Sequence, residues 1–246
     1  MLDRRRLLLG SFSTVLAARA SAAPQLQETA DIDQLGKFEF VIGRPGIVVG
    51  VPHGTSDTGT LEIGRILCER LGVGGVFVTG FWDAKTKQRV NVNRPSEALV
   101  GQDSELLRQW PSDRAIAANA RYIALVKEAA QGRLKVFYEL HSNHRASVAD
   151  SIEVSTLGLS RGDARRLKAA FEAARDRLAP DVPRLAIHVS PLDKVTYPNY
   201  GFASSISKLS ERGCAIEHPG HVVANRAWRI AYGACLAGAI KEAQWG

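Results

Sequence analysis

Residues Ile47 to Asp57, IVVGVPHGTSD, join an apolar run to a short polar loop that carries a histidine and a carboxylate. The run from Ile47 to Val51 has the length and the β-branched content of a buried strand, and the Gly, Pro and Ser that follow mark a loop at its carboxyl end. In open α/β sheets, binding sites form beyond this end of the strands. We therefore expect His53 and Asp57 to lie at such an edge.

Two more apolar runs end at a residue that could serve as a ligand or a base. The apolar run from Val136 to Leu140 ends at His141, and the short run from Cys214 to Ile216 ends at Glu217. The sequence therefore predicts that two histidines and two carboxylates converge on one edge of a sheet.

Short apolar runs alternate with longer amphipathic segments over the rest of the chain, which predicts one α/β domain with a mixed, mostly parallel sheet and helices on both faces. The length of 246 residues and the 45% hydrophobic content are those of an ordinary globular protein. Residues 81–111 lack clear periodicity, which is typical of a functional or poorly ordered segment. The expected strands are 38–42, 47–51, 75–79, 134–140, 152–156, 184–189 and 214–217, and the expected helices are 58–71, 114–131, 161–178, 204–212 and 221–243.

The first 22 residues have the features of an export signal. Three arginines, Arg4 to Arg6, precede the apolar run Leu7 to Ala18, and Ala20-Ser21-Ala22 offers the small residues of a cleavage site. The run is too short to cross a bilayer, and the paired arginines suggest the twin-arginine route. We expect residues 23–246 to form the mature domain, periplasmic or secreted, with no stable membrane insertion once the leader is cleaved. The alternative is a basic amino terminus that is never removed.

Charge and cysteine content exclude some classes of protein. The formal net charge is +7, of which residues 1–22, with four Arg and one Asp, contribute +3, so the mature chain carries only +4. No basic block with interleaved aromatics is present, so nucleic acid is not an expected partner. The three cysteines lack metal-finger spacing. A bridge between Cys214 and Cys235 is one possibility in an oxidising compartment, and burial as core residues is the other.

His53 and His141 are the first candidates for metal ligands, because neutral imidazole is the commonest metal ligand in proteins. Asp57 adds a carboxylate to the same loop as His53. The alternatives are ordinary: each histidine satisfied by a backbone carbonyl, and Ser56 or Asp57 capping the helix that starts near residue 58.

Four further groups are candidates for binding or catalysis. Asn93-Arg94-Pro95, which follows the alternating Arg89-Val90-Asn91-Val92, offers a permanently charged guanidinium for a substrate carboxylate or an oxyanion, or else is a simple turn. Glu217 is placed to act as a general base, with Glu153 as its competitor and a solvated loop residue as the alternative. Tyr197 and Tyr200 lie on a Gly- and Pro-bearing loop able to close over a site. His144, His188, His218 and His221 are weaker candidates.

The order of these motifs resembles the N-formylglutamate amidohydrolase family, which shows Pro-His-Ser/Gly, then Asp-Val-Asn-Arg-Pro, then Asp-Leu-His-Ser. The matching letters are Pro52-His53-Gly54, Val92-Asn93-Arg94-Pro95 and Leu140-His141-Ser142. With Ala215-Ile216-Glu217 added, the order is also similar to the aspartoacylase and succinylglutamate desuccinylase group and, more distantly, to zinc carboxypeptidases. The resemblance spans residues 53–217 in islands of three to six letters. Where the zinc carboxypeptidases and aspartoacylases have a glutamate ligand this chain has Ser56, and Asn91 and Glu139 replace two aspartates of the formylglutamate pattern.

The resemblance implies a zinc carboxypeptidase-like (phosphorylase/hydrolase-like) fold and one zinc ion held by His53, His141 and a carboxylate, which is Asp57 or comes from elsewhere, with Glu62 as a candidate. It also implies that Asn93 and Arg94 contact the substrate and that Glu217 is the base. The expected activity is hydrolysis of an amide bond in an N-acyl amino acid or small peptide. The alternatives are an exported peptidase of cell-wall peptides and a non-catalytic solute-binding protein on the same fold.

Overall fold

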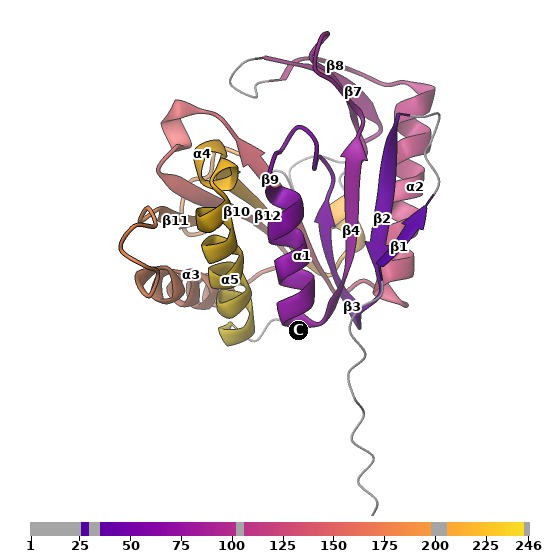
Figure 1. The fold of residues 1–246 in the computed structure, drawn as a ribbon. Helices are drawn as coiled ribbons and strands as arrows, with labels where there is room; N and C mark the ends of the chain where they lie inside the picture. The colour runs from indigo at the N-terminus through magenta and orange to yellow at the C-terminus, as the bar shows by residue number, and fades with distance from the viewer. Residues whose placement is uncertain (1–25, 30–34, 102–105, 198–205, 244–246) are drawn as a thin grey trace, which may run out of the picture.

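The computed structural model describes residues 26–29, 35–101, 106–197 and 206–243. Its main element is an eight-stranded sheet (Figure 1). The four central strands, β4, β3, β9 and β12, are mutually parallel, and β10 joins them antiparallel to β12. The strand order is β1 (Leu26–Thr29), β2 (Gly36–Val41), β4 (Val73–Gly80), β3 (Arg44–Val51), β9 (Val136–Asn143), β12 (Arg212–Pro219), β10 (Ser151–Leu157) and β11 (Ala186–Val189).

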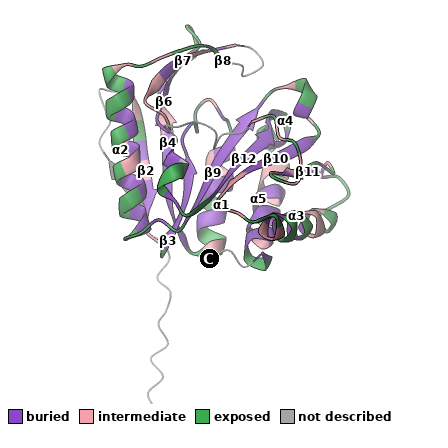
Figure 2. Cartoon of the chain, turned by 180° about the vertical axis from the view of Figure 1, so that it is seen from behind, coloured by how far each residue is buried: buried purple, intermediate pink, exposed green. Residues whose placement is uncertain are grey.

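Helices cover both faces of this sheet (Figures 1 and 2). One face packs against α1 (Thr60–Leu71), α3 (Arg161–Asp176) and α5 (Arg226–Glu242), which follows the short α4 (Gly220–Ala224). The other face packs against α2 (Asp113–Ala130), which contacts β3, β4 and β2 of this sheet. The α/β class and the helices on both faces are therefore confirmed.

Residues 81–111 form a second, antiparallel sheet of four short strands, in the order β5 (Trp82–Asp83), β6 (Gln88–Asn91), β7 (Ser96–Val100) and β8 (Leu106–Trp110). Figure 1 shows it above the edge at which β4 ends. The segment without periodicity is thus a small sheet placed over the carboxyl edge of the main one.

All seven expected strands and three of the five expected helices are present, with shifted ends. Two helix predictions are wrong. In the described part of 204–212 only a single 3-10 turn forms, Ile206–Leu209, because β12 begins at Arg212 and pairs there with Val136 of β9. The helix expected over 221–243 divides at Asn225, whose side chain caps α5 by accepting a hydrogen bond from the Trp228 backbone N–H.

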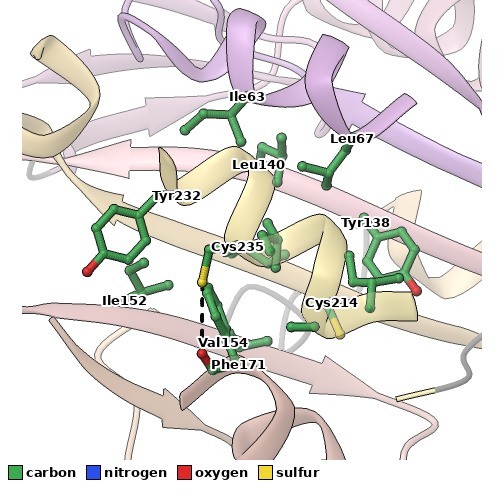
Figure 3. Close-up of a cluster of buried hydrophobic side chains, with 14 of the residues drawn as sticks. Ile63, Leu67, Tyr138, Leu140, Ile152, Val154, Phe171, Cys214, Tyr232 and Cys235 are labelled. Atoms are coloured by element: carbon green, nitrogen blue, oxygen red, sulfur yellow. Dashed lines mark hydrogen bonds between the residues drawn. The ribbon is translucent and has the colours of Figure 1, made fainter. Parts of the chain in front are cut away.

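All three cysteines are buried and free. The Cys235 thiol donates to the carbonyl of Phe171, 3.9 Å away, and Cys214 lies elsewhere in the same core (Figure 3). The core interpretation of the cysteines therefore holds and the Cys214–Cys235 bridge is absent. The expected export signal lies outside the described residues. Within the described part of the chain, no helix has the length and hydropathy needed to span a membrane.

Candidate metal centre

The loop after β3 turns the Asp57 carboxylate toward the sheet edge. The Gly54 N–H donates to the Val78 carbonyl (3.0 Å) and the Asp57 N–H to the His53 carbonyl (2.7 Å), which ties the loop to β4 and closes it on itself. At the start of helix α1, the backbone carbonyl of Asp57 accepts a hydrogen bond from the Thr60 hydroxyl at 2.6 Å. No side chain caps this helix. The capping alternative is therefore wrong, and the carboxylate of Asp57 remains available for the site.

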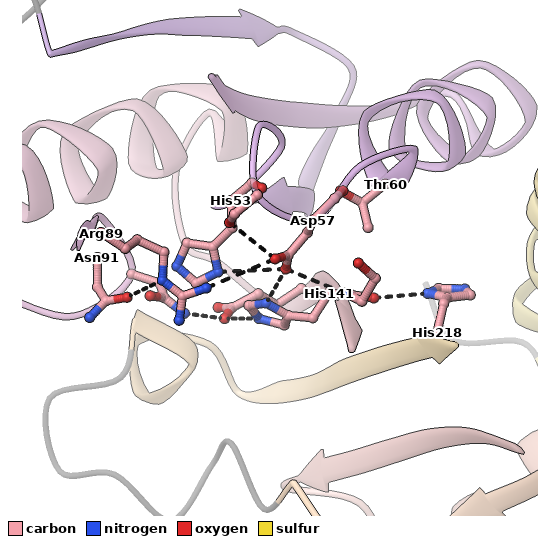
Figure 4. A network of polar contacts seen from close by, with 11 residues as sticks. His53, Asp57, Thr60, Arg89, Asn91, His141 and His218 are labelled. Atoms are coloured by element: carbon pink, nitrogen blue, oxygen red, sulfur yellow. Dashed lines mark hydrogen bonds and ion pairs between the residues drawn. The ribbon is translucent and has the colours of Figure 1, made fainter. Parts of the chain in front are cut away.

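His53, Asp57 and His141 meet at this edge (Figure 4). The two imidazole rings lie with their centroids 5.2 Å apart. Asp57 Oδ2 is 3.7 Å from His53 Nδ1 and 3.4 Å from His141 Nδ1. One ligand atom from each residue lies within 4.8 Å of the other two, and all three side chains are buried. The sequence-predicted trio is thus brought together.

The donor set fits a divalent cation. Neither ring nitrogen of His53 has a hydrogen-bond partner among the described residues, although both are buried. Burial, followed by the positive charge of Arg89, lowers the pKa of His53 to about 3, so its imidazole is neutral and carries a lone pair. Two imidazoles and a carboxylate are a common catalytic set for zinc, which leaves a further position for substrate or water.

Glu139 orients His141, and the sequence interpretation did not assign it a role. It lies two residues before His141 on β9, so both side chains leave the same face of the sheet. Its Oε1 accepts from His141 Nε2 at 2.6 Å, which leaves Nδ1 facing Asp57. Burial acts to lower the pKa of His141, but Asp57 and Glu139 together raise it to about 10, so a metal ion at Nδ1 would displace a proton. A carboxylate behind a ligand histidine fixes the ring for metal binding.

Arg89 of β6 is the second residue that the sequence interpretation left without a role. Its Nη1 lies 3.9 Å from Asp57 Oδ1, and its Nε donates to Asn91 Oδ1 at 2.9 Å. Its guanidinium also interacts with the charge of Glu217, although burial is the main cause of its lowered pKa. The small sheet therefore places a fixed cation beside the trio.

Asn93 and Arg94 lie on the turn that joins β6 to β7, as the turn interpretation expects. Asn93 Nδ2 donates to Glu139 Oε1 at 2.6 Å. Asn119 of α2 holds the turn by donating to the Val92 carbonyl at 2.8 Å. Arg94 is half-buried and interacts with the charges of Glu139 and Glu217. Both residues therefore reach the site.

Glu217 and Glu153 are register neighbours on β12 and β10, and Glu217 is also the register neighbour of His141 on β9. The two carboxylates have different environments. Glu153 accepts from the Thr196 N–H (2.9 and 3.0 Å) and the Tyr197 N–H (3.3 Å), which occupies both of its oxygens. Glu217 instead interacts with the charges of Arg89, Arg94 and His141. The carboxylate of Glu153 is thus bound by backbone N–H groups, whereas that of Glu217 lies among charged side chains.

Tyr197 lies close enough to Glu217, Glu153 and Asp57 for its hydroxyl to interact with their charges. The Arg145 guanidinium lies 4.8 Å from the centroid of its ring. Its hydroxyl is buried and without a hydrogen-bond partner among the described residues. Burial raises the pKa of Tyr197, and the negative charge of Glu217 raises it further. Tyr200, the other predicted tyrosine, lies outside the described residues.

A pocket of about 360 Å³ opens beside Asp57 and beneath the small sheet. Its lining is rich in nitrogen-bearing side chains and includes one aromatic ring: Ser56, Asp57, Trp82, Lys87, Arg89, Val100, Gly101 and His144. A substrate with negative charge fits this lining.

The remaining candidates are not members of the metal cluster. His218 is fully buried, with Nδ1 3.2 Å from the His141 carbonyl, so the solvated-loop alternative for it is wrong. Glu62, the alternative carboxylate ligand, pairs with Arg229 of α5 at 2.5 Å. His188 is half-buried on β11, and His144 and His221 are exposed.

No protein-family model matches the chain, and no curated protein matches it significantly. Among solved structures, the fold is similar to that of a bacteriophage poly-γ-glutamate hydrolase, with a TM-score of 0.51 and 12% identity over 87% of this chain and 91% of that one. A proposed carboxypeptidase A of Shewanella denitrificans OS-217 has a TM-score of 0.49 and 13% identity over 92% of this chain and 66% of that one. N-acetylmuramoyl-L-alanine amidase AmiC2 of Nostoc punctiforme has a TM-score of 0.39 and 13% identity over 79% and 94%. At these identities the likeness shows the fold alone, and the N-formylglutamate amidohydrolase resemblance rests on its short motifs.

Proposed function

We propose that this protein is a zinc-dependent amidohydrolase. The observation that carries the proposal is the buried cluster of His53, Asp57 and His141, in which neither nitrogen of His53 has a hydrogen-bond partner among the described residues. A zinc ion held there would acidify a water molecule and polarise a carbonyl group. Asp57 supplies the carboxylate that is missing at Ser56, which removes the main reason to favour a binding protein without metal.

Glu217 is the proposed general base. It stands one strand from His141, in register with it, and its carboxylate interacts with the charges of Arg89, Arg94 and His141. It would accept a proton from the attacking water and deliver it to the leaving amine. Arg89 and Arg94 would stabilise negative charge on the reacting carbonyl or hold a substrate carboxylate. Tyr197 would donate its hydroxyl hydrogen to the bound substrate.

The proposed substrate is an N-acyl amino acid, of the N-formylglutamate kind, or a small acidic peptide. The cationic lining of the pocket, with Lys87 and Arg89 beside Asp57, supports an anionic substrate. The likeness in fold to a hydrolase of poly-γ-glutamate supports cleavage of an amide bond. We also propose that the chain acts after export, on the strength of its amino-terminal sequence.

The test is a comparison of metal content and hydrolysis in wild type and three variants. Wild type should hold about one zinc per chain and release amine from N-formyl- or N-acetyl-amino acids. Glu217→Gln should retain zinc and lose turnover by about 100- to 10,000-fold, the usual worth of a general base. His141→Ala should lose zinc, whereas His188→Ala, a half-buried histidine outside the cluster, should keep it. A protein that binds no zinc, or a fully active Glu217→Gln variant, would overturn the proposal.

A further inference from the structure

The amide of Asn93 has only one possible orientation. Glu139 Oε1 accepts two hydrogen bonds, from His141 Nε2 and from Asn93 Nδ2, each at 2.6 Å. The group of Asn93 that faces Glu139 is therefore the amide nitrogen, which donates, and the carbonyl oxygen of the amide points elsewhere.

The carbonyl oxygen of the same amide is left without a donor. Asn93 is 5% exposed, and its Oδ1 is buried with no hydrogen-bond partner in the described part of the chain. The backbone that carries this side chain is fixed by two hydrogen bonds of 2.8 Å. Asn119 donates to the Val92 carbonyl, and the Ser96 N–H donates to the Arg94 carbonyl. A buried acceptor without a donor weakens the fold unless a bound molecule supplies the hydrogen.

We propose that Asn93 recognises the N–H of the substrate's amide group through this oxygen, and that Glu139 is the positioning residue that presents it. The location supports the amide N–H as the partner. Asn93 and His141 donate to the same oxygen of Glu139, so Asn93 lies beside the metal cluster, where the scissile amide would bind. Asn93 therefore selects primary and secondary amides, which have an N–H, against tertiary amides, which have none. This inference rests on the proposed amidohydrolase function. It assigns the Asn93 oxygen the role of a hydrogen-bond acceptor, whereas binding of a substrate carboxylate would require Asn93 to donate.

The test pairs two probes, N-formyl-L-glutamate and its N-methyl derivative, with wild type and Asn93→Ala. Loss of a hydrogen bond to a buried polar partner weakens binding by about 5- to 150-fold. Asn93→Ala should lower kcat/KM for the N–H probe by this factor and change that for the N-methyl probe by less than about 2-fold. Equal losses for both probes would overturn the inference. The control Asn225→Ala, which removes only the cap of α5, should keep the wild-type preference.

A binding measurement separates this inference from the proposed function. In zinc-loaded Glu217→Gln, calorimetry should show the N–H probe binding more tightly than the N-methyl probe, and the added substitution Asn93→Ala should remove the difference. If turnover is absent everywhere but this difference is found, the hydrolase proposal fails and the recognition of N–H stands. If the two probes bind equally, or neither binds, the inference fails. Glu139→Gln, which allows the Asn93 amide to reverse, should reduce the preference while Glu139→Asp restores part of it.

Discussion

Glu153→Gln tests the assignment of the two carboxylates on β10 and β12. The two oxygens of Glu153 accept from two backbone N–H groups, those of Thr196 and Tyr197. Glutamine keeps only one oxygen. One of the two N–H groups therefore loses its acceptor, and the other has a neutral acceptor in place of a charged one. A hydrogen bond to a charged group contributes about 1.5–3 kcal/mol, and the longer bond, at 3.3 Å, lies at the weak end. We expect Glu153→Gln to lower the free energy of unfolding by about 2–3 kcal/mol.

Urea unfolding of the metal-free proteins measures this loss, and hydrolysis by the zinc-loaded proteins gives the second readout. Glu153→Gln should keep kcat within about 10-fold of wild type, because the carboxylate acts on the loop and not on water. Glu217→Gln should show the opposite pattern, with turnover lost. A Glu153→Gln variant of unchanged stability and abolished turnover would refute the reasoning and make Glu153 the base.

Three further predictions concern the thiols, the pH dependence and the ion. Burial raises the pKa of all three thiols, so a thiol reagent should label no cysteine in native protein and three per chain in denaturant. Arg114 lowers the pKa of Glu97 from 4.5 to about 2, so this carboxylate stabilises the fold above pH 4.5 and the contribution is lost as the pH falls toward 2. Urea unfolding should therefore find Glu97→Gln less stable than wild type at pH 7 and equally stable at pH 2. An ion present at about 1,000 times its Kd adds about 4 kcal/mol, so a chelator should lower Tm in a thermal melt by about 8–16 °C for a domain of this size, and an unchanged Tm would count against the ion.

The convergence of His53, Asp57 and His141 could be anticipated because apolar runs fix where strands end. Parallel strands then bring those ends to one edge whatever the chain between them does. The same argument located Glu217 beside His141, since both follow apolar runs on neighbouring strands.

Glu139 and Arg89 were missed for different physical reasons. Glu139 sits inside the apolar run of β9, and only its spacing of two from His141 signals that the two side chains share a face. Arg89 belongs to a sheet whose strands have two to five residues, too short for a period to show. The alternation of Arg89-Val90-Asn91-Val92 was the one local sign of β6.

The choice between Glu217 and Glu153 also depended on contacts remote in sequence. Both residues interrupt apolar runs, so their local patterns are the same. The difference is that the backbone at 196–197 folds back onto Glu153, and no local pattern encodes that contact.

The most direct test of the metal centre is a crystal structure of the zinc-loaded protein with anomalous data collected at the zinc edge. One strong anomalous peak should lie about 2.0–2.2 Å from a ring nitrogen of His53, a ring nitrogen of His141 and a carboxylate oxygen of Asp57. A peak at another place, or density in which the side chains keep their present contacts with no ion between them, would contradict the account.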